Sequence, residues 1–319
     1  TDSAKEGSRS ELDWVPAPSV WDTVCCELGN CLNNQCPFFA DCFLMKARRR
    51  LRAADLIVAN HALFFSDLAM RQEDETIENP LLPDYAAAIL DEGHTIEETA
   101  ATHLGLRLNG YAVLRILNRL YNNETGRGLL VDLLYTDARI AVIDAAETVQ
   151  RFFKQVDGWL NRFDRLPARY THAGHVPDRL ADPLEAVENA LRPFAGSDDE
   201  EADRRQEFRS LIQRLRDFRL GMRAFLNMEA PDHVYWLEKA GASPASITLC
   251  AVPVDVGRIL QSALFAASAS PIVVTSATLA VRGSMDYFTR QIGAESARTE
   301  VLDSPFDFAR QVTLHVAEK

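Results

Sequence analysis

Short apolar runs that end in polar residues recur at three places along the chain. Residues 54–59, 86–90 and 272–274 are rich in Ala, Ile, Leu and Val, and polar groups follow them at Asn60-His61, Asp91-Glu92 and residues 275–278. Buried parallel strands have this pattern, because helices cover both faces of such a sheet. In open α/β sheets the functional groups lie at the C-terminal ends of the strands. The three runs therefore predict an α/β nucleotide-binding domain.

Helical periodicity predicts a long insertion between the second and third runs, over residues 106–228. Apolar side chains in its C-terminal part alternate in steps of three and four: Phe208, Leu211, Leu215, Phe218, Met222 and Phe225. This heptad pattern is typical of an antiparallel helical hairpin or coiled coil. A stripe that would supply the partner helix has the same spacing: Val149, Phe152, Val156, Leu160 and Phe163. After the insertion, residues 234–237 and 247–252 predict two strands that return the chain to the α/β body.

The charge balance limits what the surface can bind. The 319 residues include 34 Lys and Arg against 46 Asp and Glu, a net charge of −12. A uniformly polyanion-binding surface is therefore excluded, and any contact with nucleic acid must come from a local basic cluster. No apolar run approaches the roughly 20 residues that cross a bilayer, and no signal-peptide core is present. We expect a soluble, cytoplasmic protein without membrane contact.

The length corresponds to about two domains. The chain starts at Thr1 without an initiator Met and stops just after an apolar alternation at Val312, Leu314 and Val316. These ends lead us to expect a piece of a longer protein.

Five of the six cysteines are crowded into 18 residues: Cys25, Cys26, Cys31, Cys36 and Cys42. In a protein without secretory features, such crowding indicates a metal or iron–sulfur site rather than disulfides. The even spacing from Cys26 to Cys42, without a nearby His, suits a loop around a cubane cluster better than two zinc knuckles. Zinc remains the alternative. Cys250 lies alone in an apolar run, and we interpret it as a buried residue of a strand.

A concentrated basic segment follows Cys42 directly. It consists of Lys46, Arg48, Arg49, Arg50 and Arg52, five basic residues in seven. On a helix these side chains cover most of the circumference, so the segment is not an ordinary amphipathic core helix. Most charge runs are only solvated faces. In an acidic chain and beside a cysteine cluster, this one is a candidate for contacting phosphates.

The acidic pair Asp91-Glu92 has the Walker B arrangement at the end of an apolar strand. The first carboxylate can hold the water shell of a Mg²⁺ ion, and the second can orient or polarise the attacking water. A string of the DExH type is weak evidence alone. The segment Ser276-Ala277-Thr278, at the end of another predicted strand, strengthens it, because helicases of the DEAH type use such a segment to couple nucleotide hydrolysis to strand movement.

The order of these motifs resembles the DinG family of bacterial iron–sulfur DNA helicases, which are relatives of the XPD helicases. Residues 30–43 resemble the family's cluster loop, and residues 54–63 resemble the segment downstream of it. Ser304-Pro305-Phe306 resembles the short motif that follows the Ser-Ala-Thr segment. The resemblance runs from about Trp21 to the C-terminus and is loose across the helical insertion.

The resemblance implies an ATP-dependent helicase that unwinds DNA with 5′-to-3′ polarity and carries a 4Fe-4S cluster. Asp91 and Glu92 would take the Mg²⁺ and water roles, and His94 would link the nucleotide site to Ser276, Ala277 and Thr278. Cys31, Cys36 and Cys42 would be cluster ligands. The substrate would be single-stranded or forked DNA, with Asn60 and His61 as further DNA-contacting candidates beside the basic segment.

The implied fold is a partial RecA-like P-loop NTPase domain of the α/β class with two additions. Residues 1–53 would form part of the iron–sulfur domain, and residues 54–105 a RecA-like segment with Walker B. Residues 106–230 would form a mostly helical Arch-type insertion that encloses the single strand together with the cluster domain. Residues 231–319 would return to the RecA-like domain and begin the link to a second one.

Departures from the family keep other interpretations open. Gly93 stands where the family normally has Ala, and the family's first cluster ligand lies upstream of this sequence, so Cys26 or Cys25 would have to replace it. The chain contains no G-x-x-x-x-G-K-[ST] loop and no second RecA-like domain with its arginine finger, so alone it should be inactive. One alternative is a non-enzymatic metal-cluster module that binds single-stranded nucleic acid. Another is a zinc site with a structural acidic pair.

Overall fold

The computed structural model describes most of the chain, namely residues 6–17, 20–21, 24–26, 30–73, 80–132, 135–196, 201–266, 270–304, 306–313 and 315–316. Pro305 of the motif after the Ser-Ala-Thr segment lies outside these residues. The chain divides into two compact units, which we describe separately. Unit 1 comprises Thr1–Pro83 and Ala101–Val254, and unit 2 comprises Asp84–Ala100 and Asp255–Lys319.

Unit 2 is built on a parallel pair of strands. β1 (Ala88–Leu90) pairs with β6 (Ile272–Val274), with Leu90 opposite Val274. The two runs are therefore confirmed as parallel neighbours, but the prediction that both faces are buried is wrong, since Ile89 is 72% and Val273 48% exposed. The 3₁₀ turn η3 (Gly93–Thr95) and the start of α4 (Ile96–Leu104) follow β1. The remaining elements of unit 2 are α9 (Val256–Leu260), the π-helical turn η6 (Gln261–Phe265), α10 (Asp286–Gln291) and α11 (Phe308–Gln311).

The strand predicted at residues 54–59 is wrong. No strand is assigned to this segment, and Leu56 and Val58 are 81% and 92% exposed. It belongs to unit 1, between the helices α2 (Phe43–Arg52) and α3 (His61–Glu73). An apolar run becomes a buried strand only where neighbouring strands accept its backbone hydrogen bonds. None of the described strands pairs with this segment.

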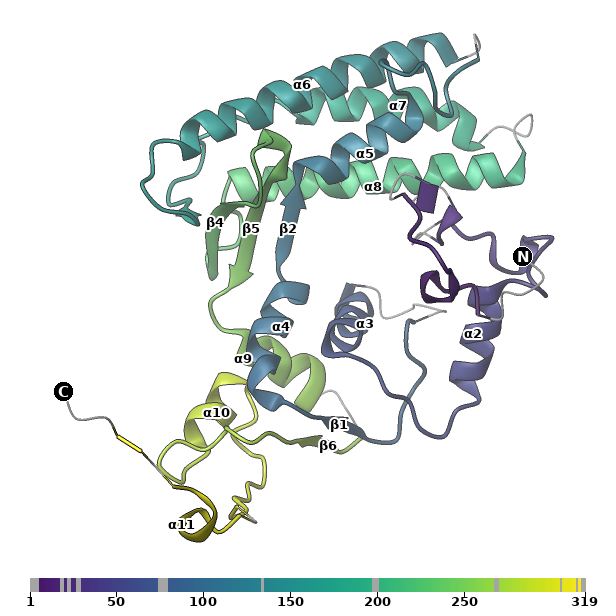
Figure 1. Cartoon of the computed structure of the whole chain (residues 1–319). Helices are drawn as coiled ribbons and strands as arrows, with labels where there is room; N and C mark the ends of the chain where they lie inside the picture. Colours follow the sequence, from purple (N-terminus) through teal and green to yellow (C-terminus); the bar gives the residue numbers. More distant parts are fainter. Residues whose placement is uncertain are drawn as a thin grey trace. The chain divides into compact units, whose positions relative to one another are not determined.

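Four helices form the core of unit 1: α5 (Gly110–Leu120), α6 (Thr136–Leu160), α7 (Ala181–Gly196) and α8 (Ala202–Leu226). They run alongside one another (Figure 1) and share one hydrophobic cluster. The whole predicted α8 stripe, from Phe208 to Phe225, is buried in this cluster. The predicted insertion is therefore mostly helical, as its periodicity indicates.

The partner assigned to α8 needs correction. The helix packed most extensively on α8 is α7, and α6 packs against α7 and α5. Four residues of the predicted partner stripe are buried in α6, whereas Phe163 lies beyond its end and is 41% exposed. A heptad stripe shows which face of a helix is buried, but any helix with a complementary face can cover it.

A four-stranded antiparallel sheet completes unit 1. Its order is β2 (Leu106–Asn109), β5 (Ile247–Pro253), β4 (His233–Lys239) and β3 (Ala168–Arg169), and the turn η5 (Pro244–Ser246) leads from β4 to β5. The two strands predicted after the insertion thus exist. β5 pairs with β2, and β4 pairs with β3, so both strands belong to the sheet of unit 1 and not to the pair β1 and β6. Cys250 is fully buried in β5, and this burial raises the pKa of its thiol to about 12.

The N-terminal part of unit 1 contains the short turns η1 (Arg9–Glu11) and η2 (Asn33–Gln35), then α2 and α3. A buried carboxylate ties α3 to the segment that follows it. Asp67 is 3% exposed and accepts hydrogen bonds from the Leu82 backbone N–H at 3.0 Å and from Arg71 Nε at 2.7 Å. None of the described helices is long and apolar enough to cross a membrane.

Candidate functional site

The parallel pairing of β1 and β6 brings two of the predicted motifs together. One residue beyond the ladder, the Thr275 N–H donates to Leu90 O at 2.9 Å, and the Gly93 N–H donates to Thr275 O at 2.8 Å. The backbone after β1 then turns sharply, with Glu92 in the left-handed region at φ 51° and ψ 46°. This conformation is costly for a residue with a side chain, and such strain is concentrated at functional sites.

Side-chain contacts continue from this backbone link. The Thr275 hydroxyl donates to Asp91 Oδ1 at 2.7 Å, and His94 Nδ1 lies 3.0 Å from Ser276 Oγ. The same Nδ1 lies 3.3 Å from Glu92 Oε2. The structure therefore brings together the predicted residues Asp91, Glu92, His94 and Ser276. Ala277 and Thr278 are exposed in the bend that follows.

Because His94 Nδ1 carries at most one hydrogen, its two contacts are alternatives. With the hydrogen on Nδ1, the ring donates to the Glu92 carboxylate or to Ser276 Oγ. With the hydrogen on Nε2, Nδ1 accepts from the Ser276 hydroxyl. His94 is therefore in a position to exchange partners between the acidic motif and the end of β6 when its proton moves.

Thr275 is the functional residue to which the sequence reasoning gave no role. It is the first of the polar residues 275–278 that follow the third apolar run, but its contact with Asp91 depends on the register of β1 against β6, which the sequence alone does not provide. The structure also accounts for Gly93. A Cβ at this position would lie 2.5 Å from Val274 Cγ1, closer than real Cβ contacts allow. With the Ala usual in the family, the Val274 side chain would have to shift, and the Thr275 carbonyl oxygen, 3.3 Å away, would also be a tight contact.

The cysteine loop is not arranged as a metal site in the described residues. Burial raises the pKa of the Cys26 thiol first, and the charges of Cys31 and Cys42 raise it further. All five cysteines of the loop are free thiols with partial or full exposure. Across the described residues, no three His, Cys, Asp or Glu side chains are arranged to hold a metal ion. The donor chemistry of five thiols fits a soft metal or an iron–sulfur cluster.

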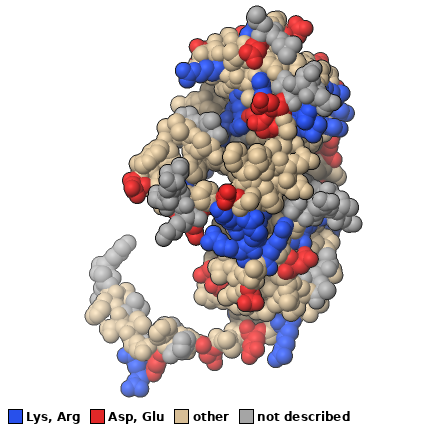
Figure 2. All heavy atoms as spheres, turned by 90° about the vertical axis from the view of Figure 1, so that its right-hand side faces the viewer, with Lys and Arg blue, Asp and Glu red and all other residues tan. Residues whose placement is uncertain are grey.

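The basic segment forms α2, which begins directly after Cys42. Two ion pairs of this helix join Lys46 to Asp41 and Arg50 to Glu6. Both are 3.4 Å long and exposed, and such pairs contribute little to stability. Figure 2 shows Lys and Arg side chains gathered on the face of the molecule that carries α2. Arg48 and Arg52 line a shallow hollow beside Pro80, Leu81 and Pro83. The helix thus presents positive charge to solvent.

Asn60 and His61 lie at the start of α3. The Asn60 side chain accepts a hydrogen bond from the Leu63 N–H at 2.9 Å, so it caps the helix. The His61 ring meets the Phe65 ring edge-on at 6.1 Å between centroids. Capping of α3 is enough to explain an asparagine at position 60. A DNA contact by Asn60 or His61 stays a prediction.

Comparison with known proteins places these motifs in context. No family model matches the chain. The ATP-dependent DNA helicase YoaA of Escherichia coli is 27% identical over 306 residues, which are 93% of this chain and 44% of that protein. The ATP-dependent helicase DinG of Mycobacterium tuberculosis is 28% identical over 334 residues, covering 98% of this chain and 44% of that protein. The probable ATP-dependent helicase YpvA of Bacillus subtilis is 26% identical, covering 88% and 43%.

The chain spans less than half the length of these curated relatives. Nearly all of it is matched, so the similarity extends through the insertion as well as the motifs. The resemblance predicted from the motifs is therefore confirmed, because curated proteins named ATP-dependent DNA helicase DinG or YoaA match 90% or more of the chain at 24–27% identity.

Proposed function

We propose that the full-length protein is an ATP-dependent DNA helicase to which this chain contributes the acidic motif, its coupling partner, a helical insertion and a cysteine loop. The observation that carries the proposal is the contact between the residues after β1 and those after β6. Asp91 contacts Thr275, and His94 contacts Ser276. Glu92 contacts His94 on the same side. Two parallel strand ends that meet in this way form the usual functional edge of an α/β sheet.

Each side chain has a definite task in the proposed reaction. Carboxylate oxygens are the ligands that Mg²⁺ prefers, and Asp91, held by Thr275, is the candidate to contact its water shell. The ion, when bound, would neutralise charge on the nucleotide phosphates. Glu92 is 65% exposed on its side chain and can orient and polarise a water molecule. His94, by exchanging between Glu92 and Ser276, would pass the state of the nucleotide to the Ser276–Thr278 segment.

The proposed substrate is single-stranded or forked DNA, with translocation in the 5′-to-3′ direction and action in the cytoplasm. The names of the relatives support a DNA helicase, and the polarity rests on the family resemblance. The test is ATP hydrolysis and strand separation by the full-length protein on forks with a 5′ or a 3′ tail. Binding of single strands without any hydrolysis would favour the non-enzymatic module.

We further propose that the cysteine loop holds a 4Fe-4S cluster through Cys31, Cys36 and Cys42, with Cys26 as the fourth ligand. The even spacing of these four cysteines, within 17 residues of the sequence, supports this set. Protein purified without oxygen should contain iron and absorb broadly near about 400 nm. Serine at Cys31, Cys36 or Cys42 should remove both signals, because the thiolates are the ligands.

The buried Cys250 provides the matched control for these substitutions. Cys250→Ser changes a thiol in β5, far along the sequence from the loop, and should leave the iron content unchanged. Stoichiometric zinc without iron in anaerobic preparations would contradict the iron–sulfur proposal and favour a zinc site.

The arginines of α2 are proposed to contact DNA phosphates. Each phosphate contact releases condensed counterions, so affinity for single strands falls with salt at a slope of about −0.7 per contact. Replacing Arg48, Arg49 and Arg50 together by Ala should weaken binding for all sequences and flatten the slope by up to about two units. Fluorescence anisotropy at several salt concentrations measures both effects.

A charge-matched control uses three other exposed arginines. Arg162, Arg165 and Arg169 follow the end of α6 and are exposed. Their replacement by Ala changes the net charge by the same amount and should leave the slope as in the wild type. Equal slopes for all three proteins would show that the basic run is only a solvated face. Iron content measured in each variant separates loss of contact from loss of the loop.

A further inference from the structure

An exposed aromatic ring stands in the middle of the cysteine loop. Phe38 lies in the turn between Cys36 and Cys42, and 75% of it is exposed to solvent. Single exposed apolar residues are common on protein surfaces and by themselves need no explanation. Two features distinguish Phe38: hydrogen bonds hold its backbone, and positive charge lies beside it.

Hydrogen bonds hold the backbone of this turn. Phe38 O accepts from the Cys42 N–H at 2.8 Å and from the Asp41 N–H at 3.1 Å, and the Phe39 N–H donates to Cys36 O at 3.0 Å. The Phe38 carbonyl is thus anchored at the first turn of α2. The backbone that carries the ring is therefore held in place, so this backbone would lose little conformational entropy when a flat partner binds against the ring.

Positive charge from α2 meets the same turn. Arg49 Nη2 donates to Ala40 O at 3.0 Å, two residues from Phe38. Consecutive Cα atoms are about 3.8 Å apart, so the Cα atoms of Phe38 and Ala40 are separated by at most about 7.6 Å. A cation and an exposed ring therefore lie within the span of one or two nucleotides of an extended strand.

Sites for single-stranded nucleic acid combine these two features, a basic track for phosphates and an aromatic face on which a base stacks. We propose that Phe38 stacks on a nucleobase of the single strand whose phosphates contact the α2 arginines. The inference rests on the proposed function and adds a base-contacting residue to it. Stacking is tolerant of sequence, since every base has a π face, so Phe38 would contribute affinity without base specificity.

The test separates base contacts from phosphate contacts by means of two probes. One is an oligo-dT single strand, and the other has the same length and backbone with abasic sites in place of the bases. Anisotropy titrations with the full-length protein, prepared without oxygen and without nucleotide, give the affinity for each. The wild type should prefer the strand with bases.

Phe38→Ala should weaken oligo-dT binding roughly five- to hundredfold, the usual range for losing one stacked base. It should leave both the salt slope and the affinity for the abasic strand unchanged. Phe38→Leu keeps apolar volume but no aromatic face and should behave like Phe38→Ala, whereas Phe38→Trp should retain the preference. Tyr111→Ala is the control, because Tyr111 is also an exposed aromatic, 48% exposed at the start of α5.

Several outcomes would overturn the inference. Wild-type affinity for oligo-dT in Phe38→Ala would do so, and so would wild-type behaviour of Phe38→Leu. An equal loss on the abasic strand would show that the substitution disturbs the turn rather than a stacked base. If the wild type binds neither strand, the proposed DNA contact fails together with this inference. Binding that depends on the α2 arginines and not on Phe38 leaves the proposed function standing and removes only the stacking role.

Discussion

A Glu92→Gln variant of the full-length protein is expected to hydrolyse ATP about 10²–10⁴-fold more slowly than the wild type, in the presence of single-stranded DNA. Glutamine has nearly the same shape, but its amide does not accept a proton from water as a carboxylate does. Glu92 is held in the left-handed conformation after β1, with its Oε2 3.3 Å from His94 Nδ1. Steady-state phosphate release with saturating DNA measures the effect.

A second glutamate close by provides the control. Glu97 lies in the first turn of α4, where its Oε1 accepts a hydrogen bond from Gln291 Nε2 at 3.5 Å. Glu97→Gln makes the same chemical change five residues away and should keep hydrolysis near the wild-type rate. ATP binding should survive in both variants. Full DNA-stimulated turnover in Glu92→Gln would contradict the assignment of the acidic pair as the hydrolytic site.

The features that the sequence predicts correctly depend on local periodicity. The stripe from Phe208 to Phe225 is buried because a heptad pattern fixes one face of a helix whatever packs against it. The runs at 86–90 and 272–274 contain β1 and β6, which pair in parallel as short apolar segments followed by polar residues predict. The meeting of Asp91-Glu92 with Ser276 followed from the rule that parallel strands end at one edge.

The features that it misses depend on which surfaces meet. Residues 54–59 have the composition of a buried strand, but burial requires partners that composition does not encode. Tertiary packing also determines that α7 and not α6 packs most extensively against α8, and that β4 and β5 form a sheet with β2. The contact of Thr275 with Asp91 depends on the register of β1 against β6. The exposure of Phe38, on which its proposed role depends, cannot be read from the sequence.

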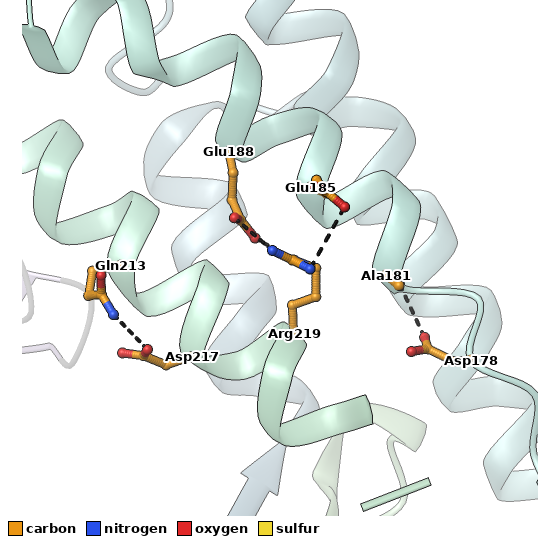
Figure 3. Close-up of polar contacts among 7 residues, drawn as sticks. All are labelled: Asp178, Ala181, Glu185, Glu188, Gln213, Asp217 and Arg219. Carbon is orange, nitrogen blue, oxygen red and sulfur yellow. Dashed lines mark hydrogen bonds and ion pairs between the residues drawn. The ribbon is translucent and has the colours of Figure 1, made fainter. Parts of the chain in front are cut away.

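Arg219→Met is expected to destabilise unit 1 by about 3–5 kcal/mol, because it leaves a buried carboxylate without its partner. Glu188 of α7 is 1% exposed on its side chain, and Arg219 of α8 is 16% exposed. Figure 3 shows the guanidinium directed at this carboxylate across the two helices. Arg219 Nε donates to Oε1 at 2.7 Å and Nη2 to Oε2 at 3.1 Å, and these bonds with Glu188 raise the pKa of the arginine.

Geometry explains the expected size of the effect. Two parallel hydrogen bonds from a planar guanidinium to one carboxylate form the strongest ion-pair arrangement in proteins. The second acid near Arg219, Glu185, is 51% exposed with its Oε2 3.8 Å from Nη1, so it adds little. Thermal unfolding followed by circular dichroism should show a fall in Tm of roughly 6–20 °C, given about 2–4 °C per kcal/mol for a unit of this size.

A double variant separates the charge from the packing. Glu188→Leu combined with Arg219→Met removes both ions and keeps apolar volume between α7 and α8, so it should recover most of the lost stability. Arg223→Met, one turn further along α8, is the control. The Arg223 side chain is 65% exposed, and its ion pair with Glu229 is long, with 3.8 Å between Nε and Oε1. It should change stability by about 0.5 kcal/mol or less. If Arg219→Met were as stable as Arg223→Met, the Glu188 carboxylate would have another partner or reach water, and the ion pair would not determine how α7 and α8 pack.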